Sequence, residues 1–294
     1  MENTRTSLVT GGTGGIGRAV ALHLAAGGDR VLIAGRSAAA GAEVVARLRQ
    51  AAPGLDHDYL PADLSLLEDT NRLAVATRHR TDRLDAIVLC AGVLATVPEW
   101  TPEDLERTFV LNYLSRYLLA RQLLPALTAA PSGRLVLVAN AGRYRDTLDL
   151  DDLQYRHQRS GLAVSGRTQF ANDLLAVELA ERVAGSTVQV SCVDPGMVKT
   201  DVFRNARGPG RALRAVALFA QRLTAADPSS AAATPAWLAQ APEAADAGGR
   251  FWTRGPRGPR EKSIPDRVRR ADRRAALWAA SEQLVINHLQ PLHR

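Results

Sequence analysis

The sequence predicts an α/β fold: a doubly wound parallel sheet in three α/β/α layers, formed by a single domain over residues 1–294. Three observations lead to this fold class. Short apolar, strand-like segments alternate with amphipathic, helix-like segments, a pattern typical of a parallel sheet covered on both faces. The first strand-like segment ends in a run of glycines and leads into a helix. A chain with 46% hydrophobic and 23% charged residues can form one sizeable core.

The expected elements follow one another in a regular order. Strands are expected where apolar or β-branched residues cluster, and helices where apolar residues recur at every third or fourth position. The expected strands are residues 7–10, 31–34, 57–60, 86–90, 134–138 and 187–193. The expected helices are residues 16–26, 38–50, 66–78, 103–129 (one helix or two) and 162–183. Residues 1–110 would then form the nucleotide-binding half, and residues 111–294 the substrate-side half.

The regular alternation ends after Gly196. Residues 204–211 are rich in Arg, Gly and Pro, which is typical of a loop, and residues 213–223 place apolar side chains on one helical face. In a doubly wound fold, the chain that follows the carboxyl end of a strand lies where ligands bind. We therefore expect a lid over a substrate at residues 200–225, with a helix that only covers the core as the alternative.

The net charge of +7 is concentrated in one segment. Residues 250–274 contain ten basic and three acidic residues, so the rest of the chain is neutral overall. No aromatic-interleaved basic groove accompanies this segment, and no apolar run is long enough to cross a bilayer. We therefore expect neither nucleic-acid nor membrane binding. The segment is interpreted as a solvated loop and helix face, with an anionic substrate or acidic partner as the alternative.

Cys90 and Cys192 are the only cysteines, and each lies within an apolar run. This pattern predicts buried, reduced thiols and no metal site. The N-terminus lacks the basic start and apolar stretch of a signal peptide. Together these features predict a cytoplasmic protein.

The strongest local motif runs from Thr10 to Gly17, with the sequence Thr-Gly-Gly-Thr-Gly-Gly-Ile-Gly. Glycines permit a sharp turn and close approach of the backbone to a pyrophosphate, and the N-terminus of the following helix offers free N–H groups. The strand before the motif and the helix after it favour a Rossmann-type dinucleotide site over a glycine-rich turn without ligand. The expected cofactor contacts here are Gly11, Thr13, Gly14, Gly15, Ile16 and Gly17.

The end of the second expected strand distinguishes between two dinucleotides. Arg36 stands where an acidic residue would accept hydrogen bonds from a ribose 2′-hydroxyl. An arginine instead suits a 2′-phosphate. We therefore expect NADP(H) rather than NAD(H), with Arg18 adding to the positive field.

Five motifs, in order along the chain, resemble those of the short-chain dehydrogenase/reductase (SDR) family. After the glycine motif come Asp63-Leu64, Cys90-Ala91-Gly92, Leu111-Asn112-Tyr113-Leu114 and Asp194-Pro195-Gly196-Met197-Val198-x-Thr200. The stretch from Gly249 to Glu282 resembles the retinol-dehydrogenase-like branch. The resemblance implies further cofactor contacts from Asp63, Leu64, Ala91, Gly92, Pro195, Gly196, Val198 and Thr200, the last two at the nicotinamide and its amide.

The same resemblance indicates that the family's proton-transfer residues are substituted. The family uses a Ser after the fifth strand and a Tyr-x-x-x-Lys on the next long helix, where the Lys lowers the pKa of the proton-donating Tyr. Asn140 stands at the Ser position. An ungapped count from residues 152–154 to residues 170–172 places Ser165 and Gln169 at the Tyr and Lys positions. Only Asn112 of the family's four residues would be retained.

No other motif clearly replaces the missing pair. Tyr155 and Arg159 repeat the Tyr-x-x-x-Lys spacing with an arginine, but ten residues early and on an expected loop. Tyr155 and Tyr144 are the candidate substitute donors, although a single tyrosine is more often ordinary packing.

Three functions are compatible with these residues. The first is an NADP(H)-binding enzyme with a non-standard reaction on a small polycyclic or secondary-metabolite substrate. That reaction would be hydride transfer to a substrate that supplies its own proton, or a non-redox cyclisation, dehydration or isomerisation. The second is an ordinary NADPH-dependent carbonyl reductase with a relocated donor. The third is a catalytically silent, cofactor-binding partner subunit.

The resemblance also suggests how subunits would associate. Family members dimerise through long helices that match residues 111–130 and 162–184. We therefore expect a homo-oligomer, a dimer or tetramer, with a heteromer containing an active homologue as the alternative.

Overall fold

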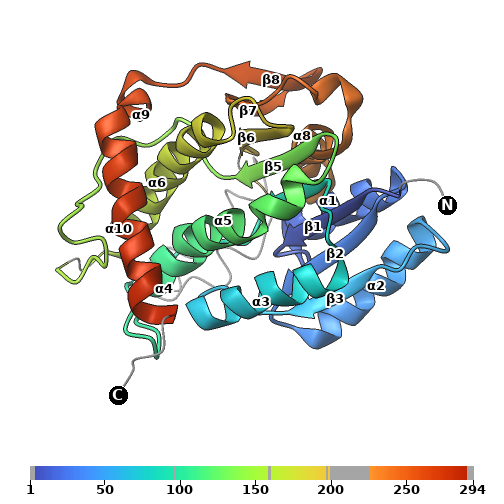
Figure 1. Ribbon diagram of the computed structural model, residues 1–294, viewed down its shortest axis with the longest axis horizontal. Coiled ribbons are helices and arrows are strands. Elements are labelled where there is room, and N and C mark those ends of the chain that lie inside the picture. The colour runs from blue at the N-terminus through green and yellow to red at the C-terminus, as the bar shows by residue number, and fades with distance from the viewer. Residues whose placement is uncertain (1–3, 96, 158–159, 197, 199–225, 290–294) are drawn as a thin grey trace.

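The computed structural model describes residues 4–95, 97–157, 160–196, 198 and 226–289, through which one eight-stranded sheet runs (Figure 1). The strands are β1 (Thr6–Thr10), β2 (Arg30–Gly35), β3 (Asp58–Pro61), β4 (Ala86–Leu89), β5 (Gly133–Val138), β6 (Val188–Asp194), β7 (Arg250–Gly255) and β8 (Gly258–Lys262). Their order across the sheet is β3-β2-β1-β4-β5-β6-β7-β8. All neighbouring pairs are parallel except β7 and β8. The predicted doubly wound sheet is confirmed, with an antiparallel edge strand added.

Helices cover both faces of the sheet, as parallel strands require crossover connections (Figure 1). One layer contains α1 (Gly15–Ala26), α2 (Ala38–Ala51) and α8 (Pro228–Gln240), and the short helix η2 (Pro242–Ala244) follows α8. The other layer contains α3 (Leu67–Arg80), α4 (Arg107–Phe109), α5 (Ser115–Thr128), α6 (Gly161–Arg182), α9 (Asp266–Arg269) and α10 (Ala271–Leu289).

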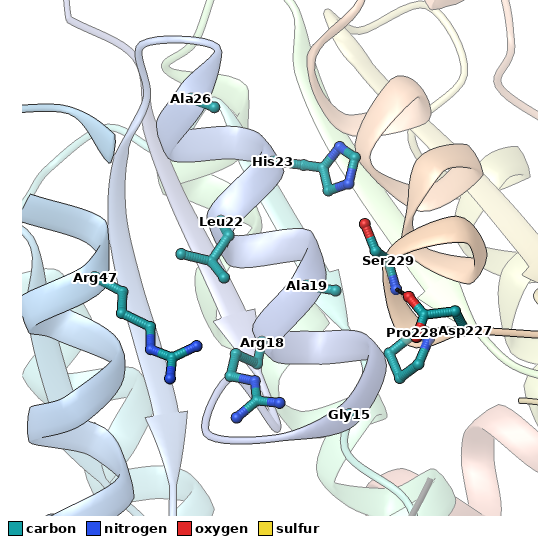
Figure 2. Close-up of a pocket in the computed structure, with 10 residues that line it drawn as sticks. All are labelled: Gly15, Arg18, Ala19, Leu22, His23, Ala26, Arg47, Asp227, Pro228 and Ser229. Carbon is teal, nitrogen blue, oxygen red and sulfur yellow. Dashed lines mark hydrogen bonds between the residues drawn. The ribbon is translucent and has the colours of Figure 1, made fainter. Parts of the chain in front are cut away.

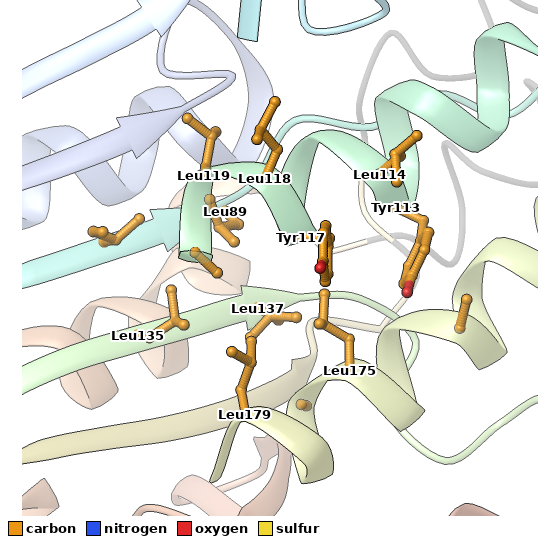
Figure 3. Close-up of a cluster of buried hydrophobic side chains, with 14 of the residues drawn as sticks. Leu89, Tyr113, Leu114, Tyr117, Leu118, Leu119, Leu135, Leu137, Leu175 and Leu179 are labelled. Atoms are coloured by element: carbon orange, nitrogen blue, oxygen red, sulfur yellow. The ribbon is translucent and has the colours of Figure 1, made fainter. Parts of the chain in front are cut away.

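The core is divided between the two faces of the sheet. Successive residues of a strand point to opposite faces. In β1, Leu8 packs in the cluster with α3, α5 and α6, whereas Val9 packs in the cluster with α1, α2 and α8. Leu89 and Val88 of β4 divide in the same way. Figure 3 shows part of the first cluster, between the sheet and α5 and α6. Burial on both faces explains why these strands are continuous apolar runs in the sequence.

The long helix expected at residues 103–129 is interrupted. A π-helical turn, η1 (Val110–Leu114), lies between α4 and α5. Such turns insert an extra residue into a helix and often occur at functional sites. Here the turn carries Asn112, whose side chain is buried.

The expectation that the alternation of strands and helices ends after Gly196 is wrong for residues 226–289, because α8 and β7 follow β6. Strand β7 continues the sheet beside β6, and a hairpin joins β7 to β8. Strand β7 contains two apolar residues, Phe251 and Trp252, which pack on opposite faces of the sheet. Because arginines surround these two residues in the sequence, no apolar run indicated the strand. Residues 250–274 are therefore not simply a solvated loop. The lid expected at residues 200–225 lies outside the described residues.

Helix α10 packs against α6 and α3, and its side chains also reach α5 (Figure 1). The rings of Trp278 and Tyr117 meet edge to face with centroids 4.8 Å apart. Arg274 is buried and pairs with Glu181 of α6 at 2.5 Å. At Arg274, too, the interpretation of the arginine-rich segment as a solvated face is wrong, because α6 supplies acidic partners.

Both cysteines are unpaired thiols, and Cys192 is fully buried between the sheet and its helices. Within the described ranges, no helix is both long and apolar enough to span a bilayer. The same ranges contain no group of three or more His, Cys, Asp or Glu side chains arranged to hold a metal ion.

Candidate active site

A cleft of about 350 Å³ opens at the carboxyl edge of the sheet, above β1, β2 and β4. The predicted cofactor residues that line it are Gly11, Thr13, Gly14, Gly15, Ile16, Gly17, Arg36, Asp63, Leu64, Ala91 and Gly92. These residues are spread over 82 positions of sequence, from 11 to 92, and the parallel strands bring their loops to one edge.

The glycine loop has the shape that a phosphate cradle needs. Gly11 has φ +66°, which favours glycine. A Cβ atom at Gly17 would collide with the carbonyl of Gly11, so only glycine lets α1 start this close to the turn. Gly14, the N-cap of α1, has no side chain to cap the helix, and a Cβ there would meet no atom within 4 Å. The first turn of α1 therefore remains open toward the cleft, as a bound pyrophosphate requires.

Arg36 and Asp63, at the β2 and β3 end of the cleft, differ in exposure and in hydrogen bonding. Arg36 is exposed, so its guanidinium can reach a phosphate at the rim. Asp63 is fixed: its Oδ1 accepts hydrogen bonds from the backbone N–H and the hydroxyl of Ser65, at 3.0 and 2.7 Å. Asp63 is thus a rigid part of the wall.

Asn112 holds the chain that follows β4. Its Oδ1 accepts a 2.8 Å hydrogen bond from the N–H of Val93, and its Nδ2 donates a 2.9 Å hydrogen bond to the carbonyl of the same residue. Its own carbonyl accepts a 2.8 Å hydrogen bond from Asn172 Nδ2 on α6. Asn112 therefore ties one wall of the cleft to the helix that carries the predicted catalytic positions.

The three positions that the resemblance predicts to be substituted lie between the end of β5 and α6. The N–H of Asn140 donates a 3.1 Å hydrogen bond to Gln169 Oε1. Ser165 lies one helical turn before Gln169, is buried, and its Oγ has no hydrogen-bond partner among the described residues. The structure brings Asn140 and Gln169 together, and none of these three side chains titrates near neutral pH.

The two candidate substitute donors have different surroundings. Tyr155 is fully buried, with its ring edge to face against Phe109 at 5.6 Å, and burial raises the pKa of its hydroxyl. Neither Tyr155 nor Tyr144 is among the residues that line the cleft. Tyr144 is 37% exposed, and its ring lies 3.3 Å from the position of a Cβ at Gly166, next to Ser165. Tyr144 is therefore the better placed of the two.

The loop after β5 is held by charged side chains that the sequence analysis did not single out. The N–H of Gly142 donates a 3.0 Å hydrogen bond to Asp173 Oδ2, and Lys262 Nζ donates a 2.5 Å hydrogen bond to the carbonyl of Ala141. Arg267 Nη2 donates to the carbonyl of Gly142 at 3.0 Å. Burial raises the pKa of Asp173 to about 7, against the lowering effects of the Gly142 N–H and Lys262. The sequence signal was an acid amid apolar residues on a long helix.

The Pro-Gly loop follows β6. Gly196 has φ +75°, and its N–H donates a 2.9 Å hydrogen bond to Asp194 Oδ1. Pro195 precedes this turn, and Val198 is buried and bridges to Ala226. Thr200 lies outside the described residues.

A second hollow, of about 410 Å³, lies on the other side of α1, between α2 and the start of α8 (Figure 2). Arg18 and Arg47 both face it. Arg18, expected to add to the field at the nucleotide, is thus found beside this hollow and not among the residues that line the cleft.

Several known proteins resemble this chain in sequence. A family model described as short chain dehydrogenase matches residues 5–146. Polyprenol dehydrogenase of Mus musculus is 35% identical over 255 residues, which cover 84% of this chain and 75% of that protein. Retinol dehydrogenase 13 of Homo sapiens is 28% identical over 284 residues, which cover 96% of this chain and 84% of that protein.

Solved structures share the fold. An uncharacterized protein from Mycobacterium paratuberculosis aligns with a TM-score of 0.73 at 25% identity, over 96% of this chain and 93% of that one. A short chain dehydrogenase from Shigella flexneri, solved with NADP, aligns with a TM-score of 0.65 at 23% identity, over 85% of this chain and 97% of that one.

Proposed function

The chain belongs to the short-chain dehydrogenase/reductase family, and from this premise we propose that it binds NADP(H) and transfers hydride to a substrate that needs no tyrosine proton donor. One observation carries the proposal. The cleft has a glycine loop, Arg36 and an Ala91–Gly92 wall, whereas Gln169, which the resemblance assigns to the position of the family's lysine, is an amide that accepts a hydrogen bond from Asn140.

The residues of the cleft fit a dinucleotide phosphate. The open first turn of α1 offers N–H groups to a pyrophosphate, and Arg36 offers a fork of donors to a 2′-phosphate. When bound, the nicotinamide would supply a hydride. Asn112 and the Pro195–Gly196 turn would shape the walls around it, because both are fixed by hydrogen bonds or backbone conformation.

The chemistry follows from what the site can do with a proton. Hydride addition to a ketone produces an alkoxide, which needs an acid in the transition state. Hydride addition to a quinone produces a phenolate instead, and a phenol has a pKa of about 10. Water can protonate that weaker base, and Asn140 could donate a hydrogen bond to the developing oxyanion. We therefore propose quinone-like, conjugated substrates. The names of the relatives, polyprenol and retinol dehydrogenases, favour an apolar one.

The test is to follow NADPH oxidation with a quinone and with a ketone of matched size. We expect NADPH oxidation with the quinone. With the ketone, we expect the rate to be lower by a factor of at least about 10². Comparable rates would overturn the proposal, as would quinone-derived product that forms without any nucleotide. Tight NADPH binding without turnover on any substrate would indicate the silent partner subunit.

Tyr144 supports a second candidate function, an ordinary carbonyl reductase with a relocated donor. Its exposed ring packs on Gly166, beside the position of the family's tyrosine. The dehydrogenase names of the relatives point in the same direction. In this case Tyr144→Phe would lower ketone reduction about 10²-fold while NADPH affinity stays unchanged. Unchanged ketone turnover in Tyr144→Phe would exclude this candidate.

A further inference from the structure

A buried arginine lies directly behind the wall of the cleft. Arg116, on α5, is only 4% exposed. Its Nη2 donates a 2.8 Å hydrogen bond to the carbonyl of Ala91, and its Nη1 donates a 2.9 Å hydrogen bond to the carbonyl of Val138. A Cβ atom at Gly92 would lie 3.6 Å from Nη2. Because Ala91 and Gly92 line the cleft, one backbone segment separates this guanidinium from a bound ligand.

The charge of Arg116 has no acidic partner in the part of the chain that the structure describes. Both hydrogen bonds go to neutral carbonyls, and Nε has no partner there. The ionisable groups that interact with it are the thiols of Cys90 and Cys192. Burial raises the pKa of Cys90 to about 12 and that of Cys192 well above its usual value, so both thiols are neutral. Burial lowers the pKa of Arg116 to about 10, so it is still protonated at neutral pH.

The charges of the two described arginines that line the cleft, Arg107 and Arg36, are compensated or screened, unlike the charge of Arg116. Arg107 pairs with Glu99 at 2.6 Å, which compensates its charge. Arg36 is exposed, so water and salt screen it. The charge of Arg116 acts through the protein interior, where electrostatic interactions are stronger. An unpaired buried charge is also costly, which suggests that it acts on a ligand.

The strand order indicates which part of a dinucleotide this charge would face. Arg36 follows β2, the glycine loop follows β1, and Ala91–Gly92 follow β4 on the opposite side of the loop. With the 2′-phosphate at Arg36 and the pyrophosphate at α1, the nicotinamide half lies toward Ala91 and Gly92. The nicotinamide ring carries a positive charge when oxidised and none when reduced.

We propose that Arg116 makes the cleft bind NADPH more tightly than NADP⁺, so that NADPH fills the empty cleft and NADP⁺ is released after hydride transfer. The inference rests on the proposed function and adds which redox form of the cofactor the cleft prefers. The phosphates are the same in both forms of the cofactor, so only the ring charge distinguishes them. For a separation of about 10 Å and an effective dielectric constant of about 20, the repulsion corresponds to about a tenfold difference in Kd.

Calorimetric titration of NADPH and NADP⁺ tests this directly. We expect the wild-type protein to bind NADPH about tenfold more tightly than NADP⁺. Arg116→Lys keeps the charge and should keep this ratio. Arg116→Gln keeps a donor but removes the charge, and should bring the two Kd values within about twofold. Arg121→Gln is the control. Arg121 lies on the same helix as Arg116 but pairs with Glu282 of α10, so its substitution should leave the ratio unchanged.

The outcomes separate the two proposals. Equal affinities in the wild type would overturn the inference, even if the variants fail to fold. Arg116→Gln could instead weaken the binding of both dinucleotides and keep the wild-type ratio of their Kd values. That result would assign Arg116 a purely structural role. Binding of neither dinucleotide by the wild type would overturn the proposed function itself, and the inference with it.

Discussion

The backbone N–H of Asn140 donates a hydrogen bond to the side-chain amide of Gln169, which links the end of β5 to the middle of α6. The resemblance to the family predicts a serine and a lysine at these positions. The amide completes the local hydrogen bonding without carrying a charge or a transferable proton. If the register from the resemblance holds, this point of the site is neutral where the family has a cation.

Restoring the family pair should restore the family's chemistry. The double variant Ser165→Tyr with Gln169→Lys should gain NADPH-dependent ketone reduction of about 10²-fold over the wild type, because a positioned phenol can protonate the alkoxide. The rate of NADPH oxidation with a ketone measures the gain. Ser165→Phe with Gln169→Lys is the matched control, since it differs only by the hydroxyl. Equal activity in both double variants would mean that position 165 does not face the substrate.

Arg36 should decide between the two dinucleotides. Arg36→Gln removes the guanidinium that we assign to the 2′-phosphate, so the Kd for NADPH should rise about 10- to 100-fold. The Kd for NADH should change little. Arg257→Gln, an exposed arginine at the hairpin between β7 and β8, controls for general loss of positive charge. Parallel losses for both dinucleotides in Arg36→Gln would contradict this role.

Asp173 should make stability depend on pH. Its pKa of about 7 in the folded protein lies above the ordinary value of 3.8, so the folded state retains a proton that the unfolded chain releases. Stability from this group is present below about pH 4 and is lost as the pH rises through about 7. The free energy of unfolding of Asp173→Asn, relative to that of the wild type, should therefore rise by on the order of 3 kcal/mol from pH 4 to pH 8. Denaturant unfolding at these two pH values measures the gain, and a constant difference would contradict the prediction.

Two glycines of the same loop should respond differently to alanine. Gly17→Ala forces a Cβ against the Gly11 carbonyl and should destabilise the protein by about 3 kcal/mol. Gly14→Ala places its Cβ in open space and should cost less than about 1 kcal/mol. Thermal unfolding of the two variants compares these costs. A Gly17→Ala protein as stable as Gly14→Ala would show that the loop can open.

Much of the fold could be predicted because its determinants are local. Strands β1, β2, β4 and β5 are buried on both faces, so each is a short apolar run that ends close to its predicted boundary. The hairpin of β7 and β8 could not be predicted in this way. Its second strand is exposed and contains no apolar run, and it forms because β7 presents an edge for pairing.

The site was predictable to the extent that motifs coincide with loops at strand ends. The glycine loop, Arg36, Asp63 and Ala91 all line the cleft. Arg116 and Asp173 escaped notice because each is a charged residue in an ordinary-looking helix, and their roles depend on which backbone carbonyl or N–H lies opposite. Such partners are far apart in sequence, so no local pattern reveals them.

The C-terminal helix changes what a neighbouring subunit would encounter. The helices expected to form a subunit contact, near residues 111–130 and 162–184, are partly covered by α10, which packs against α6 and contacts Tyr117 and Arg121 of α5. An incoming molecule on this side would touch the outward surface of α10. Proteolytic removal of residues 271–294 would uncover the aromatic ring of Tyr117 and leave Glu178 and Glu181 without Arg274. A trimmed form of the protein should therefore self-associate more readily than the intact chain.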